Sequence, residues 1–550
     1  MAGEQTVAAV LARDLAAYGA RRCFALLGTA NFKISRALAD AGVEIIAARH
    51  EGNAASMADA YAKATHELTL VSVHSGPGLT NALTGIAEAA KSRTPLLVLA
   101  GDVPAGAVKN NFHFDQAAMA RSVGAVAERI HAPATAREDT LRAVTRALRD
   151  RHTVVLSLPT DVQDAVLGGN LPPLALPPAP GLLHPDPASV RRLVEAINKA
   201  ERPVFIAGRG AVTSGAEAAI AELGDRAGAL LASSVCGHGL FAGDPWNLGI
   251  CGGFASPAAS ELVVEADLIV GFGVSLTHWT TKRGKLIAPG TTVAQIDIEG
   301  PKLGYHTPVD IAVLADALAA AEALLAALDA KKGGNGWRTE RIAARMRDGD
   351  NHLAPFEDVS SAQFIDPRTL SKAVDAMLPK ERVVASDSGH FCGWVPRYLR
   401  VPNARSSCLS HSFQSVGLGL ASAIGLGIAN PRSLVVLGAG DGGFLMSLAD
   451  LETAVRLKLR MCVLIYNDAS YAAEVHLFKR RGMSIDIVQF PDTDFAAIAR
   501  GHGARAATVR TLDDLAPVRD WVNEGAPGVF VIDGKISPDL EADWHAEHFP

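Results

Sequence analysis

A single aspartate stands inside a glycine-rich turn of a kind that often binds phosphate. The segment SLVVLGAGDGGF (residues 433–444) runs from an apolar strand pattern into this turn, which contains Gly440, Asp441, Gly442 and Gly443. The backbone N–H groups of such a turn, together with the N-terminus of the following helix, can cradle a phosphate group. Because a carboxylate inside the cradle would repel a diphosphate, a divalent cation must lie between them. The turn therefore predicts a metal-bridged diphosphate.

More oxygen ligands follow the next predicted strand. The run MCVLIY (residues 461–466) ends directly before Asn467 and Asp468, and 24 residues separate GDG from this pair. Mg²⁺ prefers oxygen ligands, commonly one or two carboxylates together with phosphates and water. We expect these ligands at the carboxyl edge of the strand beside that of Asp441, so that both groups serve one metal site.

Two other interpretations of these residues stay open. Gly438, Gly440 and Gly443 also satisfy G-x-G-x-x-G, which is typical of dinucleotide-binding folds. Alternatively, the turn is an ordinary strand-to-helix connection, and Asn467 with Asp468 is a helix N-cap. The rest of the chain favours the metal-bridged diphosphate.

A glutamate at another strand-to-helix junction supports that choice. Glu51 lies in VEIIAARHEGNAASMADAYAKAT (residues 43–65), where its simplest role is to complement a helix N-terminus. The segments RHEGNAASMADAYA, VHSGPGLTNALTGIAEA and TPLLVLAGDVP, however, closely resemble the N-terminal domain of acetolactate synthase and its relatives. The GDG and Asn-Asp spacing likewise resembles the thiamine diphosphate signature, and the resemblance covers nearly the whole chain.

The resemblance implies roles for individual residues. Glu51 would hydrogen-bond the pyrimidine ring of thiamine diphosphate and promote the tautomer that generates the reactive ylid. Asp441, Asp468 and the Ser470 carbonyl would hold Mg²⁺, although Asp468 stands where the family usually has a second Asn. The implied cofactor-binding residues are Gly389, His390, Phe391, Gln414, Val416, Gly440, Gly442, Gly443 and Tyr471. Val416 is smaller than the usual Met, Leu or Ile that props the cofactor, so Leu418 is a candidate to share that task.

Three further residues are predicted to act in catalysis. Glu474 follows Tyr471 by three residues and resembles an active-site glutamate of pyruvate decarboxylase-type enzymes. Burial beside a cofactor would raise its pKa and suit general acid catalysis, whereas a solvated helix face is the alternative. Asn31, in a glycine loop LLGTANF, and Gln116 are weaker candidates on the substrate side.

Thiamine diphosphate chemistry implies making or breaking a C–C bond beside a carbonyl. The expected reaction is decarboxylation of a 2-oxo acid and transfer of the acyl carbanion to a carbonyl acceptor. A related 2-hydroxyacyl-CoA lyase, 2-oxo acid decarboxylase or diketone-cleaving enzyme is the alternative, and a catalytically silent nucleotide-binding scaffold is another. A homodimer or homotetramer is implied, because in this family Glu51 and Asp441 of different subunits share one cofactor. Gly208 and Gly210 would permit FAD or an adenine nucleotide, and simple turns explain them equally well.

These residues must be positioned by an α/β fold. Short apolar runs alternate with Ala-rich helical stretches, which predicts three doubly wound parallel-sheet domains: pyrimidine-binding (1–168), central (188–330) and diphosphate-binding (360–540). A proline-rich linker and a polar one, 329–337, separate them. The predicted strands cover residues 68–73, 96–99, 154–158, 204–207, 268–271, 293–298, 383–386, 434–437, 462–466 and 529–532.

Composition narrows the class of protein. The chain has 550 residues and a formal net charge of −6, so no positive field would draw it to nucleic acid or an anionic membrane. No apolar run approaches the roughly 18 residues of a membrane span. Its 6 cysteines are scattered singly, as in buried reduced thiols of a cytoplasmic protein.

Overall fold

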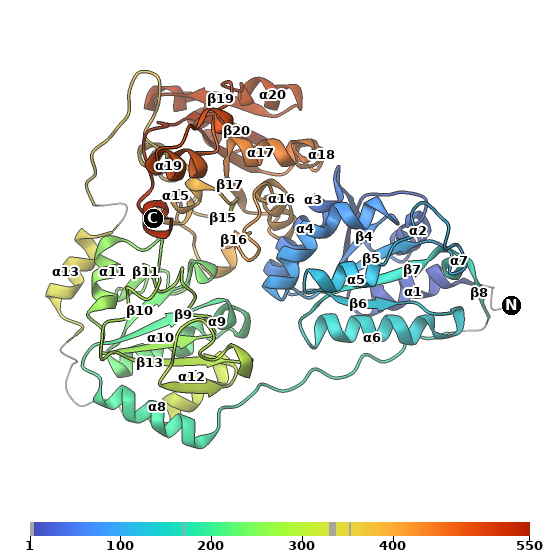
Figure 1. Cartoon of the computed structure of the whole chain (residues 1–550), viewed down its shortest axis with the longest axis horizontal. Helices are drawn as coiled ribbons and strands as arrows, with labels where there is room; N and C mark the ends of the chain where they lie inside the picture. Colours follow the sequence, from blue (N-terminus) through green and yellow to red (C-terminus); the bar gives the residue numbers. More distant parts are fainter. Residues whose placement is uncertain (1–4, 169–170, 329–336, 351–353, 550) are drawn as a thin grey trace.

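The chain forms three α/β units, each built on a six-stranded parallel sheet (Figure 1). The computed structural model describes residues 5–168, 171–328, 337–350 and 354–549. Helices cover both faces of each sheet, which confirms the predicted fold class. Among the described helices, none is long and apolar enough to cross a membrane.

The first unit holds Glu51 at the carboxyl edge of its sheet. The strands, in spatial order, are β3 (Glu44–Ala47), β2 (Arg22–Ala25), β4 (Thr69–Val73), β5 (Leu96–Asp102), β7 (Thr153–Pro159) and β6 (Val126–Arg129). One face is covered by α3 (Glu51–Thr65), α4 (Pro77–Ser92) and α5 (Gln116–Ser122). The other is covered by α1 (Val7–Ala17), α2 (Phe32–Asp40), α6 (Ala136–Leu148) and α7 (Thr160–Asp164). A short antiparallel pair joins β1 (Gln5–Thr6) to β8 (Val166–Leu167).

The central unit reverses its strand order between β9 and β12. Its strands are β11 (Asn247–Ile250), β10 (Leu230–Ser233), β9 (Pro203–Ala207), β12 (Leu268–Phe272), β13 (Thr292–Asp297) and β14 (Ile311–Leu314). Its helices are α8 (Pro187–Lys199), α9 (Arg209–Ser214), α10 (Glu217–Ala227), α11 (Pro257–Val264), α12 (Ala317–Ala327) and α13 (Glu340–Asp348). Such a reversal leaves a crevice at the carboxyl edge where α/β proteins often bind ligands.

The third unit holds the predicted metal site. Its strands are β16 (Ser407–Leu409), β15 (Arg382–Ser386), β17 (Leu434–Gly440), β18 (Met461–Asn467), β20 (Val529–Lys535) and β19 (Arg505–Val509). Its helices are α14 (Pro367–Met377), α15 (Trp394–Tyr398), α16 (Gly419–Ala429), α17 (Asp441–Ser447), α18 (Leu451–Arg456), α19 (Ala472–Arg480), α20 (Phe495–Gly501), α21 (Ala516–Asn523) and α22 (Asp543–His548).

The first and third units share one hydrophobic core. Helix α3 packs against α16, and buried residues of both helices, such as Met57 and Ile424, belong to one cluster (Figure 1). A Cβ at Gly425 would overlap the Met57 carbonyl oxygen, so the two helices meet backbone to backbone. This contact fixes the position of the first sheet relative to the third within one chain.

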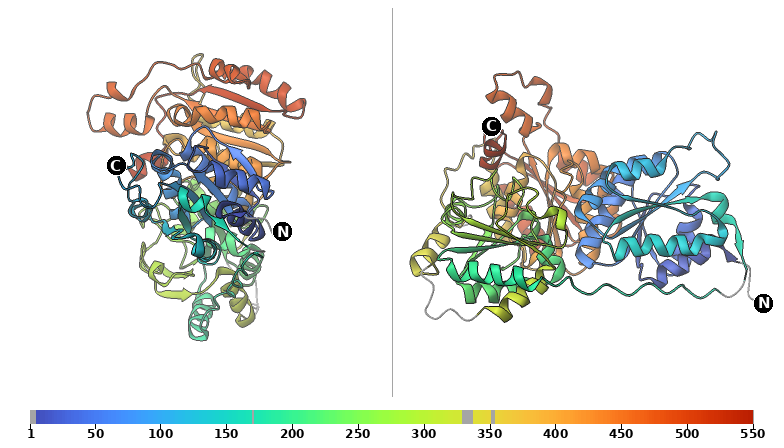
Figure 2. Two further views of the ribbon diagram at one scale, coloured as in Figure 1. Left: turned by 90° about the vertical axis from the view of Figure 1, so that its right-hand side faces the viewer. Right: turned by 60° about the horizontal axis from the view of Figure 1, so that its bottom comes forward.

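The proline-rich linker is extended, as predicted. Residues 171–186 have no regular structure and run from the first unit along the molecule to α8 (Figures 1 and 2). Asp186 ends the linker by accepting hydrogen bonds from the backbone N–H groups of Ala188 and Ser189, which caps α8. The second predicted linker, 329–337, lies outside the described residues except for Trp337.

The expectation of buried thiols was wrong for one cysteine. All 6 cysteines are free, but Cys236 is exposed while the other five are buried. Cys236 lies in the short 3₁₀ turn that follows β10, where the chain leaves the sheet and no core side chains cover it.

Candidate functional site

The two predicted metal-binding aspartates lie side by side at one sheet edge. Asp441 is the first residue of α17, directly after β17, and Asp468 directly follows β18. Strands β17 and β18 pair in parallel, with Gly440 opposite Tyr466, so both chains leave the sheet at the same edge. The backbone N–H of Gly442 donates to Asp441 (2.8 Å), and the Ser470 hydroxyl donates to Asp468 (2.9 Å).

Burial makes this pair of carboxyl groups hard to ionise. Desolvation raises the pKa of Asp441 to about 6. Desolvation and the charge of Asp441 together raise the pKa of Asp468 to about 7. No positively charged side chain is among the groups that shift either pKa. Two half-buried carboxylates, which form no ion pair with a Lys, Arg or His among the described residues, form with nearby carbonyl oxygens a donor set that suits a hard divalent cation.

Side chains pack closely behind the glycine turn. A Cβ at Gly440 would lie 3.0 Å from the Phe391 ring, and one at Gly442 would lie 2.8 Å from the ring of Tyr471. A Cβ at Gly443 would lie 2.5 Å from a carboxylate oxygen of Asp387. Glycine is therefore favoured by the surroundings at positions 440, 442 and 443, as expected for a turn whose N–H groups approach an anion.

Asp387 is a site residue that the sequence interpretation missed. It is buried directly after β15 and accepts hydrogen bonds from the backbone N–H groups of Ser388 (2.8 Å) and Gly417 (3.0 Å). Burial raises its pKa to about 6, against the opposing effect of these N–H groups. Asp387 lies between the turns at the start of α16 and of α17. Its position inside SDSGHFCGW, at the end of a predicted strand, is the signal that could have identified it.

Two of the predicted cofactor-binding residues, Gln414 and Val416, lie on an exposed loop, 411–417. Val416 is 41% exposed and approaches Gly443, while Gln414 adopts the left-handed backbone conformation, φ 61°. Leu418, the candidate to share the task of Val416, is buried at the start of α16. Only Val416 of the two presents an apolar surface to the open side of the loop.

The turn at Gly389 presents its backbone to the site, because the side chains of the next two residues, His390 and Phe391, pack inside the protein. The Phe391 ring stacks on Tyr466 (centroids 5.4 Å apart) inside the protein. His390 Nε2 accepts a hydrogen bond from the Ala542 backbone N–H (2.9 Å), and the indole N–H of Trp544 donates to the His390 carbonyl (3.1 Å). The segment around α22 therefore supports this turn.

Three imidazole rings gather beneath that turn. His390 stacks on His476 with centroids 4.7 Å apart, and His545 lies 5.3 Å from His390. Burial lowers the pKa of all three, to about 4 for His476 and His545; neighbouring imidazoles add to the effect at His390 and His476, and the charge of Arg480 adds to it at His545. These histidines are therefore neutral near pH 7 and belong to the packing of α22.

Glu51 begins α3 at the boundary between the first and third units. Its carboxylate is buried and accepts a hydrogen bond from Asn81 (3.2 Å). The residues that flank it contact the third unit, because the Arg49 backbone N–H and the Asn53 amide both donate to Asp450 (2.9 and 2.6 Å). The helix-terminus role is also present, since Glu51 lies in the first turn of α3.

The side-chain amides of Asn31 and Gln116 form their hydrogen bonds within the first unit. Both N–H groups of Asn31 are donated, to Leu26 and Ser72, and its oxygen accepts from Gly28. Gln116 donates to Gly101 and accepts from Ser157. Both residues are buried, so in this chain they shape the loops at the sheet edge and have no N–H group free for a substrate.

Glu474 occupies the predicted first helical turn but not a buried position. Its backbone N–H donates to the Tyr471 carbonyl (3.0 Å), so both residues lie at the start of α19. Glu474 is exposed in the single chain, and Tyr471 is 42% exposed. The alternative in which Asn467 and Asp468 cap this helix is wrong, because the N-cap residue is Tyr471.

Within one chain, the predicted residues thus form two groups on two different sheets. One group surrounds Asp441 at the edge of the third sheet. Glu51, Asn31 and Gln116 lie at the edge of the first sheet.

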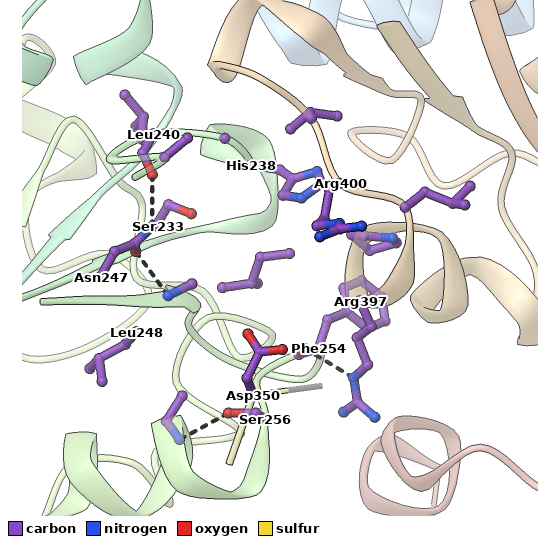
Figure 3. Close-up of a pocket in the computed structure, with 18 of the residues that line it drawn as sticks. Ser233, His238, Leu240, Asn247, Leu248, Phe254, Ser256, Asp350, Arg397 and Arg400 are labelled. Atoms are coloured by element: carbon purple, nitrogen blue, oxygen red, sulfur yellow. Dashed lines mark hydrogen bonds between the residues drawn. The ribbon is translucent and has the colours of Figure 1, made fainter. Parts of the chain in front are cut away.

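A cavity between two of the units belongs to neither group. A cavity of about 250 Å³ lies between the central and third units, and none of the predicted site residues lines it (Figure 3). Arg397, on its wall, donates to the Phe254 carbonyl (3.1 Å) and to Asp543 (2.8 Å). Its guanidinium is thus engaged within the protein.

Comparison with protein families assigns all three units. Residues 5–119 match the family described as "Thiamine pyrophosphate enzyme, N-terminal TPP binding domain". Residues 190–324 match the central domain of the same enzymes, and residues 387–533 match their C-terminal TPP binding domain. The three matches follow one another in the order of the three sheets.

Individual relatives are similar over most of their length. The chain is 28% identical to "Acetolactate synthase, catabolic" of Raoultella terrigena, covering 98% of this chain and 96% of the relative. It is 29% identical to "Acetolactate synthase large subunit" of Lactococcus lactis, covering 88% and 85%. It is 27% identical to "Sulfoacetaldehyde acetyltransferase" of Rhodobacter capsulatus, covering 98% and 95%. With its glycine cradle and three matching domains, this chain belongs to the thiamine diphosphate-dependent enzymes of the acetolactate synthase type.

Proposed function

We propose that this enzyme binds thiamine diphosphate with Mg²⁺, decarboxylates a 2-oxo acid and transfers the acyl group to a carbonyl acceptor. The observation that carries the proposal is the half-buried Asp441–Asp468 pair beside a glycine cradle. Thiamine diphosphate, when bound, supplies a carbanion next to a former carbonyl. The chain itself must bind the diphosphate, orient the ring and manage protons.

The third unit would provide binding and orientation. Asp441, Asp468 and the Ser470 carbonyl would hold Mg²⁺, and the N–H groups of the glycine turn would face the diphosphate. Val416 would support the cofactor from the loop 411–417, where it is exposed. Asp387 keeps the turns of this cradle together through hydrogen bonds to backbone N–H groups.

The first unit would provide the activating carboxylate. Glu51 Oε2 already accepts a hydrogen bond from Asn81, and its burial excludes water around the carboxylate. A carboxylate held in this way can accept or share a proton of a ring nitrogen at low cost in reorganisation. Glu474 would serve as a proton donor only once a partner surface covers it, because it is exposed in the single chain.

A homodimer or homotetramer is part of the proposal. Large apolar side chains are exposed around both groups of site residues; they include Phe32 and Phe112 in the first unit and Val416, Met446, Tyr471 and Ile487 in the third. Exposed apolar surface of this kind marks an interaction site. Contact between a first unit and the third unit of another chain would bury it and bring Glu51 to the cofactor.

The names of the similar proteins indicate which donor and acceptor substrates to test first. Acetolactate synthases and a sulfoacetaldehyde acetyltransferase are similar to this chain, so pyruvate and sulfoacetaldehyde are the first donors to test. Release of carbon dioxide with a new hydroxyketo acid from pyruvate would support the proposal. Turnover of sulfoacetaldehyde alone would replace it with acetyl transfer, and turnover of 2-hydroxyacyl thioesters alone would favour a lyase.

The decisive variant is Glu51→Gln, which keeps the size of the side chain and removes its charge. We expect activity to fall by on the order of 100-fold or more, because an activating proton acceptor contributes about 10²–10⁴-fold. Cofactor affinity, measured by calorimetry with Mg²⁺ present, should change by less than about threefold. Full activity in Glu51→Gln would overturn the proposed role.

A further inference from the structure

The loop 411–417 is held at both ends by buried carboxylates from two different units. At its C-terminal end, Asp387 of the third unit accepts hydrogen bonds from the Gly417 backbone N–H (3.0 Å to each carboxylate oxygen). At its N-terminal end, the carboxylate is Glu88, which lies on α4 of the first unit. The exposed residues between these two ends are those that the proposed function places against the cofactor.

Glu88 contacts the backbone of the loop directly. Its two oxygens accept hydrogen bonds from the backbone N–H groups of Ser412 (3.2 Å) and Phe413 (2.7 Å). Its side chain is 1% exposed, so these N–H groups have no water to replace the carboxylate. Hydrogen bonds to a charged acceptor in such a place are stronger than neutral ones.

Positive charges on both sides keep Glu88 ionised. Lys63 of α3 lies 3.3 Å away and also contacts Asp59 (2.5 Å). Arg209 of the central unit donates to the Ser412 hydroxyl (3.0 Å) and to the Ser92 carbonyl (3.1 Å). The charge of Lys63, the two loop N–H groups and Arg209 lower the pKa of Glu88 to about 2, against its burial.

The central unit therefore reaches the loop through one residue. Arg209 also contacts the sulfur of Cys236 (3.3 Å), so its guanidinium joins side chains or backbone of all three units. The loop N-terminus is thus the point where the three units meet through polar contacts.

We propose that Glu88 is a positioning residue, which sets the conformation of the loop 411–417 and thereby the affinity of the enzyme for thiamine diphosphate. This inference rests on the proposed function, because that function places the loop against the cofactor. Glu88 does not touch the cofactor itself. It fixes the backbone N–H groups of Ser412 and Phe413, which directly precede Gln414 in the loop, so a change at Glu88 acts through the loop.

The test is Glu88→Gln in the full-length enzyme. The amide of a glutamine would present N–H to the N–H of Ser412 or Phe413 and would leave Lys63 with only Asp59 as a charge partner. We expect the Kd for thiamine diphosphate with saturating Mg²⁺ to rise by about tenfold, as for residues that support a ligand set. At saturating cofactor, kcat should stay within about twofold of the wild type, because the reacting groups are intact.

Asp14→Asn is the matched control. Asp14 is equally buried, is paired with Arg137 (2.8 Å), and lies on α1 across the sheet from α4. We expect this variant to lose thermal stability without a change in Kd for the cofactor. If Glu88→Gln behaves like Asp14→Asn, with lowered stability and unchanged Kd, Glu88 has only a structural role and the inference is overturned.

Hydrogen–deuterium exchange separates this inference from the proposed function. In the cofactor-free enzyme, residues 412–417 should exchange at least about tenfold faster in Glu88→Gln than in the wild type, because one of the two hydrogen bonds is replaced by an N–H···H–N conflict and the charge of the acceptor is lost. Unchanged exchange would overturn the inference even if the cofactor binds normally. A wild type that binds no thiamine diphosphate would instead refute the proposed function, while the exchange result would still show whether Glu88 holds the loop.

Discussion

The central and third units have the same architecture, but the glycine turns at their sheet edges have different surroundings. Both are six-stranded parallel sheets with a glycine-containing turn after an inner strand. In the central unit, the N–H of Gly208 donates to Phe272 (3.0 Å) and that of Gly210 to Gly273 (2.9 Å). A Cβ at either glycine would lie 2.6 Å from the backbone of Gly273.

The glycines of the third unit face side chains and carboxylates instead. Asp387, Asp441 and Asp468 gather there, and the loop 411–417 leaves its apolar residues exposed. The glycine turn of the central unit is thus closed by its own neighbour, whereas that of the third unit is surrounded by carboxyl groups. The shared α/β fold therefore provides the same kind of sheet edge in both units, and the residues of the loops determine whether that edge can bind a ligand.

Among the substitutions that test this difference between the two sheet edges, Asp441→Ala should have the largest effect on cofactor binding. Removing a direct metal ligand should weaken Mg²⁺-dependent binding of thiamine diphosphate by on the order of 100-fold or more, because loss of mere supporting residues costs about 10–100-fold. Calorimetric titration with and without Mg²⁺ measures this. Unchanged affinity would mean that the third edge is not the diphosphate site.

Asp468→Ala should have the next largest effect. We expect Mg²⁺-dependent cofactor affinity to fall by about tenfold, since Asp441 and the Ser470 carbonyl remain. Asp468→Asn keeps an oxygen ligand and removes the repulsion, so its loss should be smaller than that of the alanine variant. Equal affinity in the wild type and Asp468→Ala would exclude Asp468 as a ligand.

The pH dependence of stability and of cofactor affinity tests the assignment of Asp441 and Asp468 in a second way. The pKa values of Asp441 and Asp468, about 6 and about 7, exceed those of an unfolded aspartate. The metal-free protein therefore binds more protons than its unfolded chain, and it loses stability as pH rises through this range. Mg²⁺ needs the ionised pair, so cofactor affinity should rise by about tenfold or more from about pH 5 to pH 7.

Thermal unfolding and titration at several pH values test this expectation. In Asp468→Asn the remaining carboxyl group loses its charged neighbour, so the pH dependence should become shallower. A cofactor affinity that does not vary over this range would contradict the assignment of the pair.

Gly210→Ala should have the smallest effect on the cofactor. Its new Cβ would meet Gly273, so we expect a loss of about 1–3 kcal/mol in the free energy of unfolding. Cofactor affinity should stay within about twofold, because this turn has no place in the site. A large loss of affinity with intact stability would show that the central edge also takes part.

The inner strands of the three sheets were the most predictable part of the fold. All ten predicted strands correspond to strands, among them β4, β9 and β17, since a strand buried on both faces is a continuous apolar run. Most of the missed strands, such as β6, β14 and β16, lie at or near sheet edges, where the runs are short and mixed in polarity. Helix α17 also begins earlier than expected, at Asp441 itself.

The site was predictable where a motif is local and was not where it depends on distant contacts. Asp441 and Asp468 each follow an apolar strand, so their meeting could be inferred from parallel topology. Asn31 and Gln116 are buried by partners elsewhere in the first unit, which no spacing reveals. Glu88 contacts a loop 325 residues later in the chain, and only the packing of α4 against the third unit brings them together.

The turn at Gly389 also has a consequence for the order in which the protein is made. His390 is held by the backbone N–H of Ala542 and by the indole of Trp544, 152 and 154 residues further along the chain. During synthesis, the first two units and most of the third emerge before these residues exist. Chains truncated before residue 542 and released from the ribosome should therefore have their sheets in place but an unfinished cradle, so cofactor capture becomes one of the last events in the maturation of each chain.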